Sequence, residues 1–102
     1  MSYYEYKRIK DGGHKVYKAD VVLINETGLH ARPASMFITE ASKRSSKITV
    51  LKDGKEYNGK SIMGILSMGA YKGDKLTIIA DGQDEKDAVE MLKKMIETGF
   101  GE

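Results

Sequence analysis

The chain has 102 residues, of which 40% are hydrophobic and 31% are charged, and its net charge at pH 7 is +2. This length fits a single domain, and so small a net charge gives no reason by itself to expect binding of nucleic acid. The absence of cysteine excludes disulfides and thiolate metal sites, no segment approaches the roughly 20 apolar residues of a membrane span, and the N-terminus lacks the apolar run of a signal peptide, so we expect a cytoplasmic protein.

The first 16 residues do not show the pattern of a packed element. They mix tyrosines with lysines and then pass through Asp11-Gly12-Gly13. A flexible extension and a strand added at a sheet edge are both compatible with this composition. We therefore divide the chain into an N-terminal extension, residues 1–16, and a domain, residues 17–102, and we expect His14 to be an exposed linker side chain.

The first half of the domain predicts a strand, a loop and a helix. Residues 19–24 are β-branched and apolar, which indicates a strand, and residues 25–28 form a loop. Residues 31–43 carry apolar side chains at helical spacing, and Pro33 lies in the first turn, where its missing N–H has no cost. The expected buried face consists of Ala34, Phe37, Ile38 and Ala41.

The middle of the chain predicts a hairpin followed by a short helix. Residues 48–51 indicate a strand, and Asp53-Gly54 is a strong signal for a two-residue hairpin turn. The return strand should end near Tyr57. Ser61 is then placed to cap a helix over residues 62–68.

The last third predicts a strand and a helix. Residues 75–80 alternate in the manner of a central strand, Asp84 is a suitable N-cap for the following helix, and Gly99 should end that helix. The order strand, helix, strand, strand, helix, strand, helix is typical of an α+β fold with helices on one face of a mainly antiparallel sheet. The apolar face of the last helix should contain Ala88, Val89, Leu92, Met95 and Ile96.

His30 lies at the head of the first predicted helix, within Gly28-Leu29-His30-Ala31-Arg32-Pro33-Ala34. The first N–H groups of a helix lack intrahelical partners, and the helix dipole favours negative charge there. A phosphoryl group on the imidazole would therefore meet a ready anion site, and the guanidinium of Arg32 matches phosphate oxygens. On residues 30–32 alone, a histidine that merely caps the helix remains the simpler interpretation.

Two segments resemble the signatures of one family. The segment 28–34 resembles the active-site segment of HPr, the phosphocarrier of the phosphoenolpyruvate–sugar phosphotransferase system (PTS), and residues 60–69 resemble the second signature of that family. The resemblance runs from about Val16 to the end of the chain. It implies an α+β open-faced β-sandwich, in which a four-stranded antiparallel sheet has three helices on one face.

The resemblance also implies a function for the histidine. His30 matches the residue that enzyme I phosphorylates at Nδ1 using phosphoenolpyruvate, and Arg32 matches the arginine that steadies the phosphoryl group. The phosphate then passes to the IIA units of sugar permeases. Such a carrier is a phosphorylated intermediate without turnover of its own, and it needs no metal or cofactor, no direct contact with nucleic acid and no insertion into a membrane.

A regulatory serine and a docking patch follow from the second signature. Ser61 matches the serine that an ATP-dependent kinase phosphorylates in Bacillota, and a kinase/phosphorylase is therefore a possible partner. Ile62, Met63 and Leu66 match an exposed apolar patch that docks partner proteins, whereas we expect Ile65 and Met68 to lie in the core.

Three other functions stay open. The chain could be a regulatory module that acts, once phosphorylated on Ser61, as corepressor of a transcription regulator in carbon catabolite control. Some relatives lack the histidine and act only in this way, so the presence of His30 argues against an exclusively regulatory role. A carrier in a nitrogen-related phosphorelay would have nearly the same motifs, and a binding domain of similar fold without phosphate chemistry would need two coincidental motifs.

Overall fold

A computed structural model of the chain describes residues 6–9 and 15–102, with side chains from residue 16 onward. Within this part, the element order from the second strand onward is the predicted one, and no helix is long and apolar enough to cross a membrane. The elements are β1 (Tyr6–Ile9), β2 (Lys15–Val22), α1 (Ala31–Ser42), β3 (Lys47–Lys52), β4 (Lys55–Asn58), α2 (Ile62–Ser67), β5 (Lys75–Asp81), α3 (Glu85–Glu97) and a 3₁₀ turn, η2 (Gly99–Gly101).

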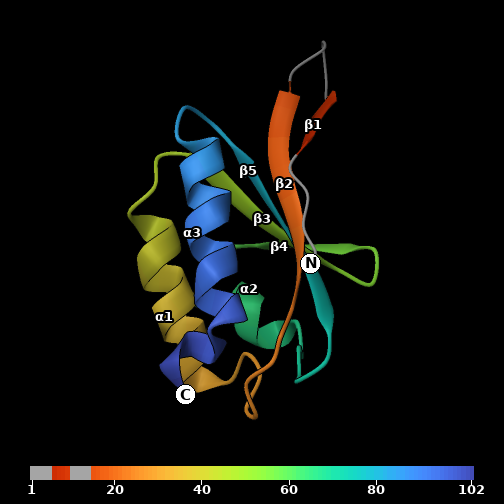
Figure 1. Cartoon of the computed structure of the whole chain (residues 1–102), viewed down its shortest axis with the longest axis vertical. Helices are drawn as coiled ribbons and strands as arrows, with labels where there is room; N and C mark the ends of the chain where they lie inside the picture. The colour runs from red at the N-terminus through yellow and green to blue at the C-terminus, as the bar shows by residue number, and fades with distance from the viewer. Residues whose placement is uncertain (1–5, 10–14) are drawn as a thin grey trace.

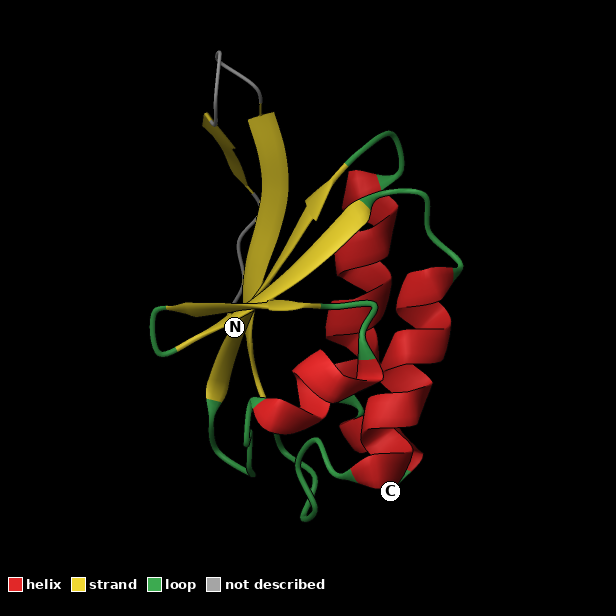
Figure 2. Ribbon diagram, turned by 180° about the vertical axis from the view of Figure 1, so that it is seen from behind, coloured by secondary structure: helices red, strands yellow, loops and turns green. Residues whose placement is uncertain are grey.

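The strands form one antiparallel sheet in the order β1-β2-β5-β3-β4. Ile78, in the middle of β5, lies opposite Ala19 of β2 on one side and Val50 of β3 on the other. The three helices pack on a single face of this sheet (Figures 1 and 2). The strands β2, β5, β3 and β4 with these helices confirm the predicted open-faced sandwich.

The sheet contains one strand more than the four that were predicted. β1 pairs with β2, with Tyr6 opposite Lys18 and Ile9 opposite Lys15, so the sheet has five strands. Of the two possibilities for the extension, the described residues therefore support an edge strand. The boundary at residue 16 stays a prediction, and His14 lies outside the described residues.

The core lies between the sheet and the helices. Phe37 of α1, Ile65 of α2 and Leu92 of α3 are fully buried against the inner face of the sheet. Full burial of such a side chain contributes about 1.5–3 kcal/mol, so the three helices are held mainly by these apolar stripes. The expected burial of Ile65 and Met68 is confirmed, and so is that of Ala34, Phe37 and Ala41, with Ile38 packed at the margin.

The start of α3 differs in detail from the prediction. Asp84 occupies the N-cap position, but its side chain makes no capping hydrogen bond. Its carboxylate instead accepts hydrogen bonds from the backbone N–H groups of Ser45 and Ser46, each at 3.0 Å, and from the Ser46 hydroxyl. These hydrogen bonds, that of the Ser46 hydroxyl foremost, lower the pKa of Asp84 from 3.8 to about 2. Asp84 therefore joins α3 to the loop between α1 and β3.

Candidate phosphorylation site and docking surface

His30 is the N-cap residue of α1. Its backbone is extended, with φ −84°, and its carbonyl oxygen accepts the first helical hydrogen bond from the N–H of Ala34 at 2.9 Å. The imidazole is exposed and makes no capping hydrogen bond. The capping role that residues 30–32 alone would favour is therefore absent, and the ring faces solvent at the head of the helix.

The first turn of α1 suits an anion. The backbone N–H groups of Ala31 and Arg32 have no acceptor within the helix, and Pro33 contributes no N–H. The turn contains no acidic residue, and the side chain of Arg32 is exposed. The first turn thus combines the partial positive charge of the helix start with the full positive charge of Arg32, and it contains no carboxylate to oppose a phosphoryl group.

The loop before His30 packs closely against the segment that follows α2. Gly28 has φ +59°, and a Cβ atom there would lie 2.6 Å from the carbonyl oxygen of Ala70 and 2.7 Å from Cα of Tyr71. The N–H of Leu29 donates to the same Ala70 oxygen at 3.1 Å. Only glycine fits so close an approach at this φ, so Gly28 lets the loop bend and sets His30 beside the chain leaving α2.

The C-terminal residue holds the same loop from the other side. Asn25, which is buried, donates from Nδ2 to the carbonyl oxygen of Gly28 at 2.9 Å. The Thr27 hydroxyl donates to the Glu102 carboxylate at 3.2 Å, and the C-terminus lies beside the start of α1 (Figure 1). The sequence gives no signal for this contact, because 75 residues separate the two partners.

An ion pair also joins the loop to the segment after α2. The Lys72 ammonium lies 2.6 Å from the Glu26 carboxylate. The hydrogen bond from Lys72, with its charge, lowers the pKa of Glu26 below its usual value. The negative charge of Glu26 is therefore compensated by the ammonium group of Lys72.

Ser61 occupies the N-cap position of α2, as predicted. Its hydroxyl oxygen accepts a hydrogen bond from the N–H of Gly64 at 3.0 Å, and its side chain is partly exposed. This geometry confirms the capping role of Ser61, while a regulatory role stays a prediction.

The outer side of α2 carries apolar side chains. Ile62, Met63 and Leu66 are exposed, with Met63 at 73% exposure, and α2 packs against α1. Exposure at the three positions agrees with the expected patch, and their role in docking stays a prediction. Tyr71, which follows the helix and was not predicted to belong to the patch, is also exposed, at 68%. No apolar period marks a single residue in a loop, so only its neighbours in space identify it.

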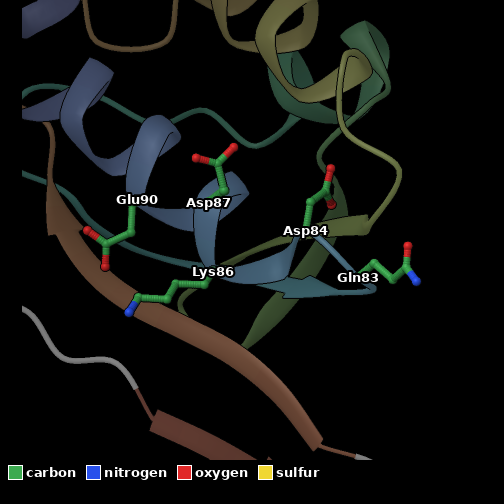
Figure 3. A pocket seen from close by; sticks show the side chains of 5 residues that line it. All are labelled: Gln83, Asp84, Lys86, Asp87 and Glu90. Atoms are coloured by element: carbon green, nitrogen blue, oxygen red, sulfur yellow. The ribbon is translucent and has the colours of Figure 1, made fainter.

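A separate hollow of about 380 Å³ lies at the start of α3 (Figure 3). Its charge is mainly acidic, and α3 begins at the opposite end of the helical layer from the start of α1 (Figure 1). Within residues 6–9 and 15–102, no group of three or more histidine, aspartate or glutamate side chains could hold a metal ion. The hollow is lined by Gln83, Asp84, Lys86, Asp87 and Glu90.

Comparison with known proteins identifies the family. Residues 17–98 match the family model described as "PTS HPr component phosphorylation site". The HPr-like protein Crh of Halalkalibacterium halodurans is 47% identical over 72 residues, which cover 71% of this chain and 86% of that relative. HPr-C-His from Thermoanaerobacter tengcongensis superposes with a TM-score of 0.81 at 48% identity, covering 83% of this chain and 96% of that one. The phosphocarrier protein HPr from Bacillus anthracis str. Ames gives a TM-score of 0.77 at 38% identity, with coverages of 79% and 96%. The chain therefore belongs to the HPr family.

Proposed function

We propose that the chain is a phosphocarrier that accepts a phosphoryl group on His30 from phosphorylated enzyme I and passes it to IIA units of sugar permeases. The observation that carries this proposal is the start of α1. There an exposed histidine occupies the N-cap position without a capping hydrogen bond, and the first turn contains Arg32 and no acid.

The chemistry needs only a nucleophilic ring nitrogen and a stabilised phosphoryl group. Neutral imidazole supplies the nitrogen, which the family resemblance assigns to Nδ1. A P–N bond to His30 forms as the bond between the donor group and phosphorus breaks, and the donor group leaves with its electron pair. Arg32 and the N–H groups at the start of α1 then stabilise the phosphoryl oxygens. The same steps in reverse order deliver the group to an acceptor.

Protein partners must approach His30 over its neighbouring surface. Ile62, Met63 and Leu66 of α2 supply exposed apolar contacts, and a flexible methionine suits a surface that serves several partners. Enzyme I and the IIA units are the partners that this proposal requires, and the cytoplasm is where we expect the exchange to occur.

Intact-mass analysis tests the carrier role. The chain is incubated with phosphoenolpyruvate, Mg²⁺ and enzyme I from a Gram-positive bacterium, and is then washed with acid. We expect the mass to rise by one phosphate before the acid wash and to return to its starting value after it. The His30→Ala variant should show no such gain, although its circular dichroism should be unchanged. Residual acid-labile phosphate on the folded His30→Ala variant would show that another residue accepts the phosphoryl group.

A second function, regulation through phosphoserine, is favoured by the partly exposed N-cap position of Ser61 and by a named relative. The solution structure of Crh, described as "the Bacillus subtilis Catabolite Repression HPr", has 42% sequence identity to this chain and a TM-score of 0.61. Phosphorylation of Ser61 by an ATP-dependent kinase would add about two negative charges beside the apolar patch of α2. We propose that this form binds a catabolite-control transcription regulator and accepts phosphate on His30 more slowly.

The substitution Ser61→Asp tests that coupling. A carboxylate at the start of α2 should slow phosphorylation of His30 several-fold, because it repels the incoming phosphoryl group and adds charge to the docking surface. Ser61→Asn is the neutral control, since asparagine also caps helices well. Equal initial rates for the two variants in the enzyme I assay would show that a negative charge at Ser61 does not regulate phosphorylation of His30.

A further inference from the structure

Tyr71 is a large exposed side chain that the proposed function has not used. It lies in the segment between α2 and β5 and is 68% exposed. Its backbone is fixed on both sides: its N–H donates to the Asp74 carboxylate at 2.8 Å, and its carbonyl oxygen accepts from the N–H of Asp74 at 3.0 Å. Because this backbone is already fixed, a partner that covers Tyr71 has to order only its side chain.

The backbone of Tyr71 lies against the loop that carries His30. Its Cα atom is 2.7 Å from the position that a Cβ on Gly28 would occupy. The preceding residue, Ala70, accepts the hydrogen bond from Leu29, the neighbour of His30 in the chain. The loop before α1 and the segment after α2 lie at the same end of the molecule (Figures 1 and 2). A protein that reaches His30 therefore also comes close to Tyr71.

The side chain of Tyr71 turns back toward the end of α2. Its hydroxyl oxygen lies 3.9 Å from the position that a Cβ on Gly69 would occupy, and the N–H of Gly69 donates to the carbonyl oxygen of Leu66. Leu66 is one of the exposed apolar residues of α2. The phenol thus continues the apolar patch of α2 toward the loop of His30.

We infer that Tyr71 is a further binding residue of the docking surface and packs against an apolar part of the phosphoryl-donor protein. This inference rests on the proposed function and names a residue that neither family signature contains. Tyrosine is among the side chains that most often dominate protein interfaces, because it buries a large rigid surface and keeps a polar tip. Tyr71 acts in recognition and touches no reacting atom, so its removal should change affinity and leave the phosphoryl step unchanged.

Direct binding separates this inference from the carrier chemistry. Isothermal titration calorimetry with unphosphorylated enzyme I from a Gram-positive bacterium is performed in a His30→Ala background, where no transfer can occur. We expect Tyr71→Ala to weaken binding about tenfold and Tyr71→Phe to bind nearly as well as the parent. Met91→Ala is the matched control, since Met91 is an exposed apolar residue on α3, at 39% exposure, outside the proposed surface.

Kinetics supply the second measurement. With His30 intact, Tyr71→Ala should raise the KM of the enzyme I reaction for this chain about tenfold at unchanged kcat. Unaltered affinity and KM in a folded Tyr71→Ala variant would overturn the role of Tyr71 while leaving the carrier proposal in place. Failure of the unsubstituted chain to bind enzyme I or to accept phosphate would overturn both.

Discussion

The starts of α1 and α3 both present backbone N–H groups without intrahelical acceptors, but the chain treats these two helix starts in opposite ways. Both helices expose N–H groups that favour negative charge. At α3 the chain supplies that charge itself, because Glu85 and Asp87 lie in the first turn. At α1 the first turn has no acid, and the N-cap residue is a histidine whose side chain makes no capping hydrogen bond.

The acids near the start of α3 are also engaged in fixed contacts. Glu85 accepts a hydrogen bond from the N–H of Gly82 at 3.1 Å, and Asp87 pairs with Arg44. Asp84 binds the loop between α1 and β3. One helix start therefore serves stability, whereas the other leaves its positive end accessible. We interpret this difference as the physical basis for placing the phosphoryl acceptor at α1.

Among the tests of this comparison, the largest expected effect comes from making α1 resemble α3. Ala31→Glu places an acid in the first turn next to His30, at an exposed position. The carboxylate should compete with the phosphoryl group for the helix start and repel it, and a penalty of about 1.4 kcal/mol in the transition state slows transfer about tenfold. The same acid should stabilise the helix by about 0.3–1 kcal/mol, so activity and stability should change in opposite directions.

Ala31→Gln is the control for this substitution, because it adds nearly the same bulk without charge. Initial rates of phosphorylation by enzyme I and thermal unfolding are measured for both variants. A slow glutamine variant would indicate steric obstruction of docking, and a glutamate variant with the parental rate would contradict the electrostatic difference between the two helix starts.

Sequence patterns predicted those features that depend on neighbours in the chain. The periodic apolar residues defined α1 and α3, and the predicted place of His30 at the head of α1 is confirmed by its N-cap position. The hairpin turn at Asp53 and Gly54 is confirmed, since both residues have positive φ, 52° and 79°. Each of these features depends on residues that are only a few positions apart in the chain.

Features that depend on distant neighbours were not predicted. Asp84 was expected to cap its own helix, but donors from Ser45 and Ser46, almost 40 positions earlier, take up its carboxylate. The contact between Thr27 and the C-terminal Glu102 and the closeness of Tyr71 to Gly28 likewise arise only when the sheet brings separate loops together. Residue propensities and local sequence patterns describe only neighbours in the chain, so they do not predict such contacts.

The second prediction concerns the fixed acid near α3. Asp84→Ala removes the acceptor for two backbone N–H groups and for the hydroxyl of Ser46, whose side chain is fully buried. Leaving buried donors without a partner is unfavourable, so we expect Tm to fall by several degrees. Phosphorylation of His30 should continue at the parental rate below Tm, because α1 starts at the other end of the helical layer (Figure 1). Gln83→Ala, beside it in the chain, is the control, and an unchanged Tm in Asp84→Ala would contradict the stabilising role.

The smallest expected effect is a pH dependence caused by the same carboxylate. The folded pKa of Asp84 is about 2, below the ordinary value of 3.8, so between these values the unfolded chain binds a proton that the folded chain does not. The stabilisation by ionised Asp84 is therefore complete above the ordinary pKa and is lost as pH falls from 3.8 toward 2.

Urea unfolding at pH 7, 4 and 2.5 should show a steeper loss of stability for the parent chain than for Asp84→Asn, whose side chain does not ionise. Glu26 and Glu40 also have lowered pKa values, but they titrate in both proteins, so the difference between the two curves isolates Asp84. Parallel curves would mean that the carboxylate contributes equally in the folded and unfolded chains, and α3 would then differ from α1 in sequence but not in how its charge stabilises the fold.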